Sequence, residues 1–136
     1  MASWMDTLIK VNKIYEKNYQ QEYAELQQKH NRLQQEVLEL QNRANSYAKK
    51  LSSIMNPINL QFAYNQSLEI KKYIVELQKQ TMDCKTECEK ILEKLKEKMQ
   101  NRVLIEGMKE KKEKQEAAEE QAKEEALLVE LSRQVV

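Results

Sequence analysis

The chain has 136 residues, with 23 basic and 22 acidic side chains and a formal net charge of +1. It lacks the excess of positive charge by which proteins displace counterions from nucleic-acid phosphates, so nucleic-acid binding is not expected. Aromatic residues make up 6% of the chain and charged residues 33%, with one glycine and one proline. A thick multilayer core is therefore not expected, and the composition is typical of long helices and coiled coils.

The first helix is predicted to begin at Ser3, because Ser3 and Asp6 have the spacing of a weak capping box. Its first turns carry more large apolar residues than are needed for the line of contact between two helices, which we call a seam. From Leu26 the apolar residues narrow to a single line, alternately four and three residues apart. This first seam comprises Leu26, His30, Leu33, Val37, Leu40, Ala44, Tyr47, Leu51 and Ile54. Such a period keeps one edge of a helix facing a partner helix.

A turn is predicted near residues 55–59, around the only proline. Asn56 is a good N-cap, and Pro57 fits the first helical position because its missing N–H has no helical partner there. Pro57 also disfavours helical geometry at Asn56. The alternative is one continuous helix kinked at Pro57, which would have to dimerise. The hairpin is favoured because an interior proline costs about 3 kcal/mol, whereas here a cap is supplied.

The second helix is predicted to run from about Pro57 to at least Ile105. Its seam comprises Ile70, Ile74, Leu77, Thr81, Cys84, Cys88, Ile91 and Leu95. Antiparallel pairing about the turn would place Leu51 opposite the region of Phe62, and Leu8 opposite Ile105. The predicted fold is therefore all-α: an antiparallel two-helix coiled-coil hairpin over residues 1–106, formed within one molecule.

A charged C-terminal extension follows at residues 107–136, and the sequence leaves open whether it is helical or flexible. It ends in the apolar residues Leu127, Leu128, Val129 and Leu131. This tip is either a docking peptide, a segment that folds back on the hairpin, or a frayed end.

The sequence predicts no catalytic residue, no cofactor and no metal site. It has no Gly-rich phosphate loop and no Ser, His and Asp set at plausible spacing. His30 occupies a seam position, where a polar residue more often fixes helix register than catalyses. Cys84 and Cys88 lie on one helix face at seam positions, so small buried side chains are expected there, and not a disulfide or metal site.

No apolar run approaches the roughly 18 residues that span a bilayer, and the N-terminus has no secretory pattern. A cytoplasmic protein without membrane insertion is therefore expected.

A second apolar edge lies beside the seam of the second helix. Tyr64, Leu68 and Val75 follow this edge, and Phe62 adds another large apolar group nearby. An apolar edge left exposed on a soluble hairpin is typical of a binding surface. The alternative is a locally wider core near the turn.

Three stretches resemble a known family: "LIKVNKIYEKNYQQEYAEL", "YNQSLEIKKYI" and "CEKILEKLKEKMQNRVLIEGMKEKKEKQEAAEEQA". They are similar to the FliJ family, the small coiled-coil proteins of flagellar type III export, and to its YscO relatives in injectisomes. The resemblance covers most of the chain. It implies a non-enzymatic antiparallel coiled coil similar to the central stalk subunit of rotary ATP synthases.

The resemblance also implies partners. Family members bind the hexameric export ATPase, the cytoplasmic domain of the membrane export gate and some export chaperones. They work in the cytoplasm, peripherally associated with the inner-membrane export apparatus, and couple ATP hydrolysis to gate opening. By position, Phe62, Tyr64, Leu68 and Val75 would contact the gate. Trp4, Leu8, Val11 and Tyr15 would contact the ATPase.

Two other classes of function stay open. One is a generic coiled-coil adaptor or homodimeric tether, and the other is a chaperone for export substrates.

Overall fold

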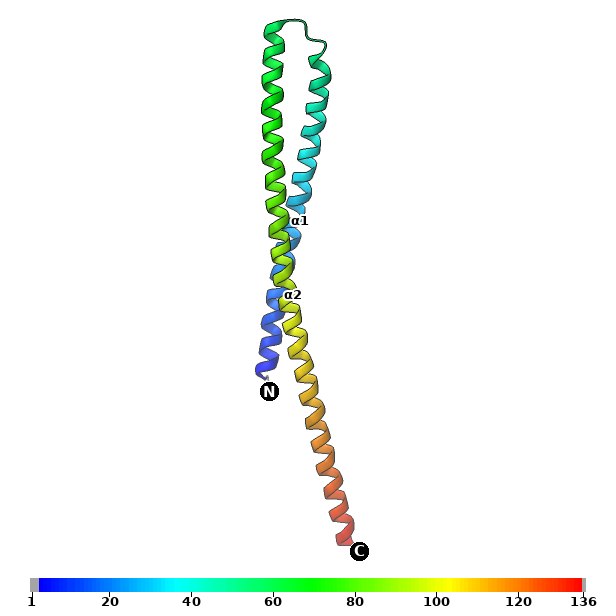
Figure 1. The fold of residues 1–136 in the computed structure, drawn as a ribbon. Coiled ribbons are helices and arrows are strands. Elements are labelled where there is room, and N and C mark those ends of the chain that lie inside the picture. Colours follow the sequence, from blue (N-terminus) through cyan, green and yellow to red (C-terminus); the bar gives the residue numbers. More distant parts are fainter. Residues whose placement is uncertain (1–2, 136) are drawn as a thin grey trace. The chain divides into compact units, whose positions relative to one another are not determined.

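The structure is a computed structural model that describes residues 3–135, and it has two α-helices (Figure 1). Helix α1 spans Trp4–Leu51 and α2 spans Pro57–Val135, with no strand among the described residues. The predicted all-α class is confirmed. The chain divides into two compact units, unit 1 (Met1–Asn18 with Leu95–Val136) and unit 2 (Tyr19–Lys94). The boundary predicted at residue 106 is a different division, and it stays a prediction.

Helix α1 begins with the capping box that the sequence predicts. The Ser3 N–H donates to Asp6 Oδ2 at 3.3 Å, and the Asp6 N–H donates to Ser3 Oγ at 3.3 Å. Each side chain thus satisfies a backbone donor that has no partner within the helix. A carboxylate in the first turn also interacts favourably with the positive end of the helix dipole.

The turn between the helices is built from side chains that bind backbone groups. The hydroxyls of Ser52 and Ser53 donate to the carbonyls of Lys49 and Lys50, at 2.9 and 2.8 Å. Asn56 Oδ1 accepts the Ile58 N–H at 2.9 Å, so Asn56 is the N-cap of α2 as predicted. Helix α2 therefore begins at Pro57, where the missing N–H costs nothing.

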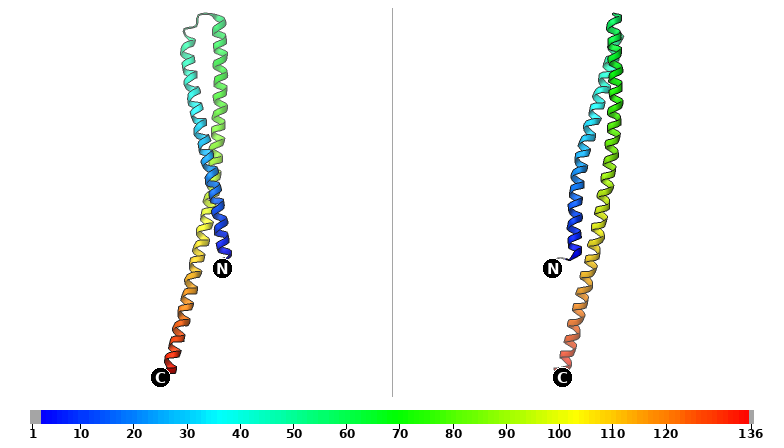
Figure 2. Two further views of the ribbon diagram at one scale, coloured as in Figure 1. Left: turned by 180° about the vertical axis from the view of Figure 1, so that it is seen from behind. Right: turned by 90° about the vertical axis from the view of Figure 1, so that its left-hand side faces the viewer.

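Unit 2 is an antiparallel pair of helices held by the two predicted seams, except for Leu95, which belongs to unit 1 (Figures 1 and 2). Every residue of both seams is buried or half-buried. The core cluster consists of Leu33, Leu77, Cys84 and Cys88, with Tyr23, Leu26, Val37 and Leu40 packed against it. No described side chain is fully buried, because a seam between only two helices has solvent on both sides.

Unit 1 contains a helix pair of its own, between the N-terminal part of α1 and the later part of α2. Met5, Ile9, Asn12 and Glu16 are buried, and they extend the alternating spacing of four and three residues. On α2, Leu95 is buried and Ile105 is half-buried. The seam residue of α1 here is Ile9, so its neighbour Leu8, expected opposite Ile105, lies outside the seam with 41% of its surface exposed.

The C-terminal extension is helical through Gly107 as far as Val135. Residues 111–135 are all exposed, the apolar tip included. The composition of this stretch explains its helix, because Ala, Glu, Lys and Gln have high helix propensity. An ion pair one turn apart, between Lys114 Nζ and Glu110 Oε1 at 3.2 Å, adds a small contribution.

Candidate interaction surfaces

The two cysteines of unit 2 are structural side chains. Both are buried and free of disulfides, and the Cys84 Sγ–H donates to the Leu26 carbonyl at 3.4 Å. Burial, followed by the proximity of Cys84, raises the pKa of the Cys88 thiol. A raised pKa keeps the thiol protonated, and the thiolate is the form that attacks substrates or binds metals. Among residues 3–135 no group of three His, Cys, Asp or Glu side chains could hold a metal ion.

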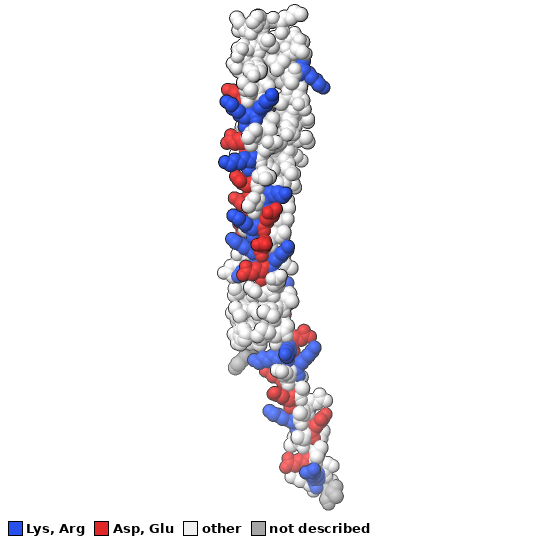
Figure 3. All heavy atoms as spheres, in the orientation of Figure 1, with Lys and Arg blue, Asp and Glu red and all other residues white. Residues whose placement is uncertain are grey.

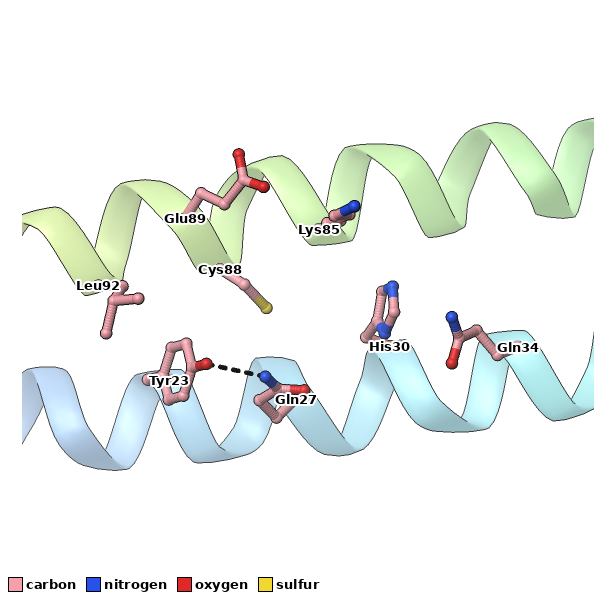
Figure 4. Close-up of a pocket in the computed structure, with 8 residues that line it drawn as sticks. All are labelled: Tyr23, Gln27, His30, Gln34, Lys85, Cys88, Glu89 and Leu92. Atoms are coloured by element: carbon pink, nitrogen blue, oxygen red, sulfur yellow. Dashed lines mark hydrogen bonds between the residues drawn. The ribbon is translucent and has the colours of Figure 1, made fainter.

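A hollow lies on one side of the unit 2 seam, and His30 lines it (Figure 4). Helix α1 contributes Tyr23, Gln27, His30 and Gln34, and α2 contributes Lys85, Cys88, Glu89 and Leu92. Tyr23 and Gln27 engage each other, since Gln27 Nε2 donates to the Tyr23 hydroxyl at 2.8 Å. His30 is half-buried at its seam position.

The other side of the seam has a different chemistry. A second hollow there is lined by Leu26 and Ile91 of the seam and by charged residues from both helices: Glu22, Glu25, Lys29, Arg32, Glu87, Lys90 and Lys94. The α1 lining of the first hollow has no carboxylate, lysine or arginine. Unit 2 therefore has one side lined by charged residues of both helices, and one side on which α1 contributes glutamine, tyrosine and histidine side chains.

The four residues that the resemblance assigns to the export gate are all exposed in unit 2. Phe62, Tyr64, Leu68 and Val75 expose 64%, 54%, 39% and 65% of their surfaces. The seam beside them is formed by Ala63 and Ser67, which expose only 4% and 6% of their surfaces. The alternative of a wider local core near the turn does not hold for these residues, because two helices supply no third surface to cover them.

The four residues assigned to the ATPase lie in unit 1 and are exposed as well. Trp4, Leu8, Val11 and Tyr15 expose 59%, 41%, 39% and 44% of their surfaces. Spacings of four, three and four residues place them on one edge of α1, beside the buried seam. Figure 3 shows an area without charged side chains over this N-terminal part of α1 and the neighbouring turns of α2.

The unit 1 seam is held partly by charges, beginning with Arg102. Arg102 Nε contacts Glu16 Oε2 at 2.7 Å and Oε1 at 3.0 Å, and its Nη1 contacts both Glu106 oxygens at 3.1 Å. The bonds to Glu16, followed by those to Glu106, raise the pKa of the guanidinium. Glu16 is only 6% exposed, so the arginine neutralises a carboxylate that has lost most of its water.

Two further cation contacts join the helices of unit 1. Lys109 Nζ lies 2.5 Å from Asp6 Oδ1, and this bond is the largest cause of the lowered pKa of Asp6. Lys98 Nζ lies 4.6 Å from the centre of the Tyr15 ring, a cation–π contact. Polar and charged side chains therefore share the seam of unit 1 with Met5, Ile9 and Leu95, while Trp4, Leu8 and Val11 are exposed.

Sequence reasoning missed the polar members of the seam: Asn12, Glu16, Ser67 and Arg102. Their signal is the spacing itself, because the rhythm of four and three residues runs on from the apolar seams through these positions. A search for apolar residues alone ends the seam where polar side chains replace them.

No protein-family model, curated protein or solved structure matches this chain. Over the described part of the chain, neither helix has a stretch apolar and long enough to cross a membrane.

Proposed function

We propose that this chain is a non-enzymatic coupling component of a type III protein export apparatus, similar to the FliJ family. In this role it binds the hexameric export ATPase and the cytoplasmic domain of the membrane export gate, in the cytoplasm at the inner-membrane export apparatus. One observation supports the proposal best. The residues assigned to the ATPase and those assigned to the gate are all exposed, while other residues form the buried seam between the helices.

The apolar edge of unit 1 supports the ATPase contact. Trp4, Leu8, Val11 and Tyr15 are exposed, yet half of the seam next to them is polar, since it consists of Met5, Ile9, Asn12 and Glu16. Exposing large apolar residues while burying polar ones reduces the stability of an isolated chain. The arrangement makes physical sense if a partner covers the apolar edge.

The edge formed by Tyr64 and Leu68 supports the gate contact in the same way. The two residues are four apart on α2 and expose 54% and 39% of their surfaces. Neither residue belongs to the buried seam, so truncating both is expected to affect binding more than folding. Each side chain, if fully covered by a partner, would contribute about 1.5–3 kcal/mol.

The experiment measures both contacts with the full chain. A Tyr64→Ala, Leu68→Ala double variant should bind the gate's cytoplasmic domain about a hundredfold more weakly, with an unchanged thermal melt by circular dichroism. A Trp4→Ala, Leu8→Ala double variant should lose stimulation of ATP hydrolysis by the export ATPase.

The matched control is Leu127→Ala, which removes an exposed leucine outside both edges. This variant should retain gate binding and ATPase stimulation. The proposal fails if the unchanged chain neither binds the gate domain nor stimulates the ATPase. A melt that collapses in the Tyr64 and Leu68 variant would show instead that this edge is structural.

A further inference from the structure

One face of unit 2 has no charged residue on α1, over a stretch in which the rest of α1 is heavily charged. Glutamine pairs recur every seven residues at 20–21, 27–28 and 34–35, and Gln41 with Asn42 continues the series. All of these residues except Gln27, which is half-buried, are exposed. A seven-residue repeat keeps them on one side of the helix. We call this side of unit 2 the amide face.

A third residue of each seven-residue repeat lies on the same side of α1 and is uncharged too. These residues are Ala24, Asn31, Leu38 and Asn45, and each is exposed. In the view of Figure 3 most charged side chains in the part nearer the turn lie along one edge, and the area over α1 there is mostly uncharged. Solvent-facing helix surfaces normally carry charge, whereas the centres of protein interfaces are depleted of it. The α1 part of the amide face therefore shares one feature with the centres of protein interfaces, the absence of charged residues.

Helix α2 contributes an apolar row to the same face. Gln27 and Gln34 of α1 and Glu89 of α2 line one hollow, so these positions lie on one side of the seam. Steps of seven residues back from Glu89 lead to Met82, Val75 and Leu68, which are 67%, 65% and 39% exposed. This row continues the Tyr64 and Leu68 edge beyond the residues that the sequence analysis assigned to it.

Each helix places one large apolar residue at the same level near the middle of the face. The Tyr47 hydroxyl donates to Gln66 Oε1, which fixes the level at which the two helices face each other. Going back from Tyr47 to Leu38 and forward from Gln66 to Val75 covers equal lengths of the two antiparallel helices. Leu38 and Val75 therefore lie at one level, with exposed fractions of 59% and 65%.

We propose that a second copy of this chain docks on the amide face, with the two-fold axis passing near Leu38 and Val75. A side-chain amide both donates and accepts hydrogen bonds, so two identical amide surfaces can satisfy each other. A two-fold interface requires such self-complementarity. A strongly charged partner would leave its own charges without counterions along α1. Helix α2 also places Lys71, Lys85 and Glu89 on this side, and Lys71 is only four residues from Val75. The long stem of a lysine lets its ammonium reach the rim of the face and stay in water.

The size of the face suits a stable dimer. Residues 20–48 of α1 extend over about 43 Å at 1.5 Å per residue. Two helices whose axes are 8–10 Å apart present a face about 20 Å wide, so each copy would bury about 800 Å². That area is the usual size of a specific protein–protein interface.

This inference goes beyond the proposed function and does not rest on it, because a single purified protein tests it. If the proposed function also holds, the second copy competes with the export gate for Tyr64, Leu68 and Val75. Self-association would then hold the coupling protein in a form that cannot reach the gate.

The test is sedimentation equilibrium of the full chain from low micromolar to several hundred micromolar concentration. The unchanged chain should show a monomer–dimer equilibrium. Leu38→Glu places a charge at the centre of the face and should weaken the dimer at least tenfold, with the same melt by circular dichroism. Leu104→Glu makes the same change at a residue of unit 1 that is 65% exposed, and should leave the dimer intact.

The amides provide a second, more conservative pair of variants. Gln34→Glu combined with Gln41→Glu should weaken the dimer at neutral pH. Gln100→Glu combined with Gln115→Glu adds the same charge at two exposed glutamines of unit 1, and should not weaken it. A monomer at every concentration would overturn the proposal. An undiminished dimer in Leu38→Glu, or a dimer lost equally in Leu104→Glu, would overturn it too, because the contact would then lie elsewhere.

Discussion

Two leucines on the same helix allow the seam of unit 2 to be tested with one kind of substitution. Leu33 is 7% exposed and belongs to the core cluster, whereas Leu38 is 59% exposed and lies outside the seam. Leu→Ala removes the same atoms and changes helix propensity by the same few tenths of a kcal/mol at both positions. The difference between the two variants therefore isolates packing in the seam.

The expected magnitude follows from the shape of the seam. Buried Leu→Ala changes cost about 2–5 kcal/mol, depending on how far the surroundings collapse into the space left behind. Two helices can shift toward each other, and solvent borders the seam on both sides. We therefore expect Leu33→Ala to cost about 2–3 kcal/mol of unfolding free energy, near the low end of that range. Leu38→Ala should cost less than about 0.5 kcal/mol.

The assay is urea unfolding followed by circular dichroism at 222 nm, at low micromolar protein so that any self-association does not contribute. The midpoint should fall clearly for Leu33→Ala and stay within error for Leu38→Ala, with similar slopes for both. Equal destabilisation by the two variants would refute the seam assignment, because it would mean that Leu38 is packed as tightly as Leu33.

Three further predictions concern the helix ends and the thiols. Asn56→Ala removes the N-cap of α2 and should cost about 1 kcal/mol in the same urea assay, whereas Asn56→Asp should cost much less. The pKa of Asp6 is held below its ordinary 3.8, first by the bond from Lys109 and then by the bond from the Ser3 backbone. The ionised carboxylate therefore stabilises the fold fully above pH 3.8, and this stabilisation is lost as the pH falls through the lowered pKa. An acid titration of Trp4 fluorescence should show this loss in the unchanged chain and not in Asp6→Asn. A thiol reagent should modify Cys84 and Cys88 only as fast as the helices open, and rapid labelling at neutral pH would contradict their burial.

Much of the fold could be predicted from the sequence, because its signals are local or strictly periodic. The capping box at Ser3, the turn at Asn56 and Pro57, and both apolar seams appear in the structure as expected. Each rests on a spacing that the helix geometry converts directly into a position. For Tyr64 and Leu68 the sequence left two possibilities, an exposed edge or a wider local core, and the structure exposes 54% and 39% of their surfaces.

The polar part of the seam could not be predicted from residue types. Glu16 and Arg102 are far apart in sequence, and nothing in either residue alone indicates that they meet in unit 1. A carboxylate is normally left in water, and only the arginine supplied by the other helix makes its burial tolerable. The pairing is thus a property of two helices in register, which no single stretch of sequence contains.

By itself, then, the sequence determined where each helix begins, where the chain turns and which leucines face inward, because a helix repeats every 3.6 residues whatever surrounds it. Only the tertiary structure decided what lies across the seam. The exposed row of Leu68, Val75 and Met82 belongs to one helix, and the uncharged row around Leu38 belongs to the other. Antiparallel packing places both rows on the same side of unit 2, because the register of the two helices sets which of their outer edges adjoin.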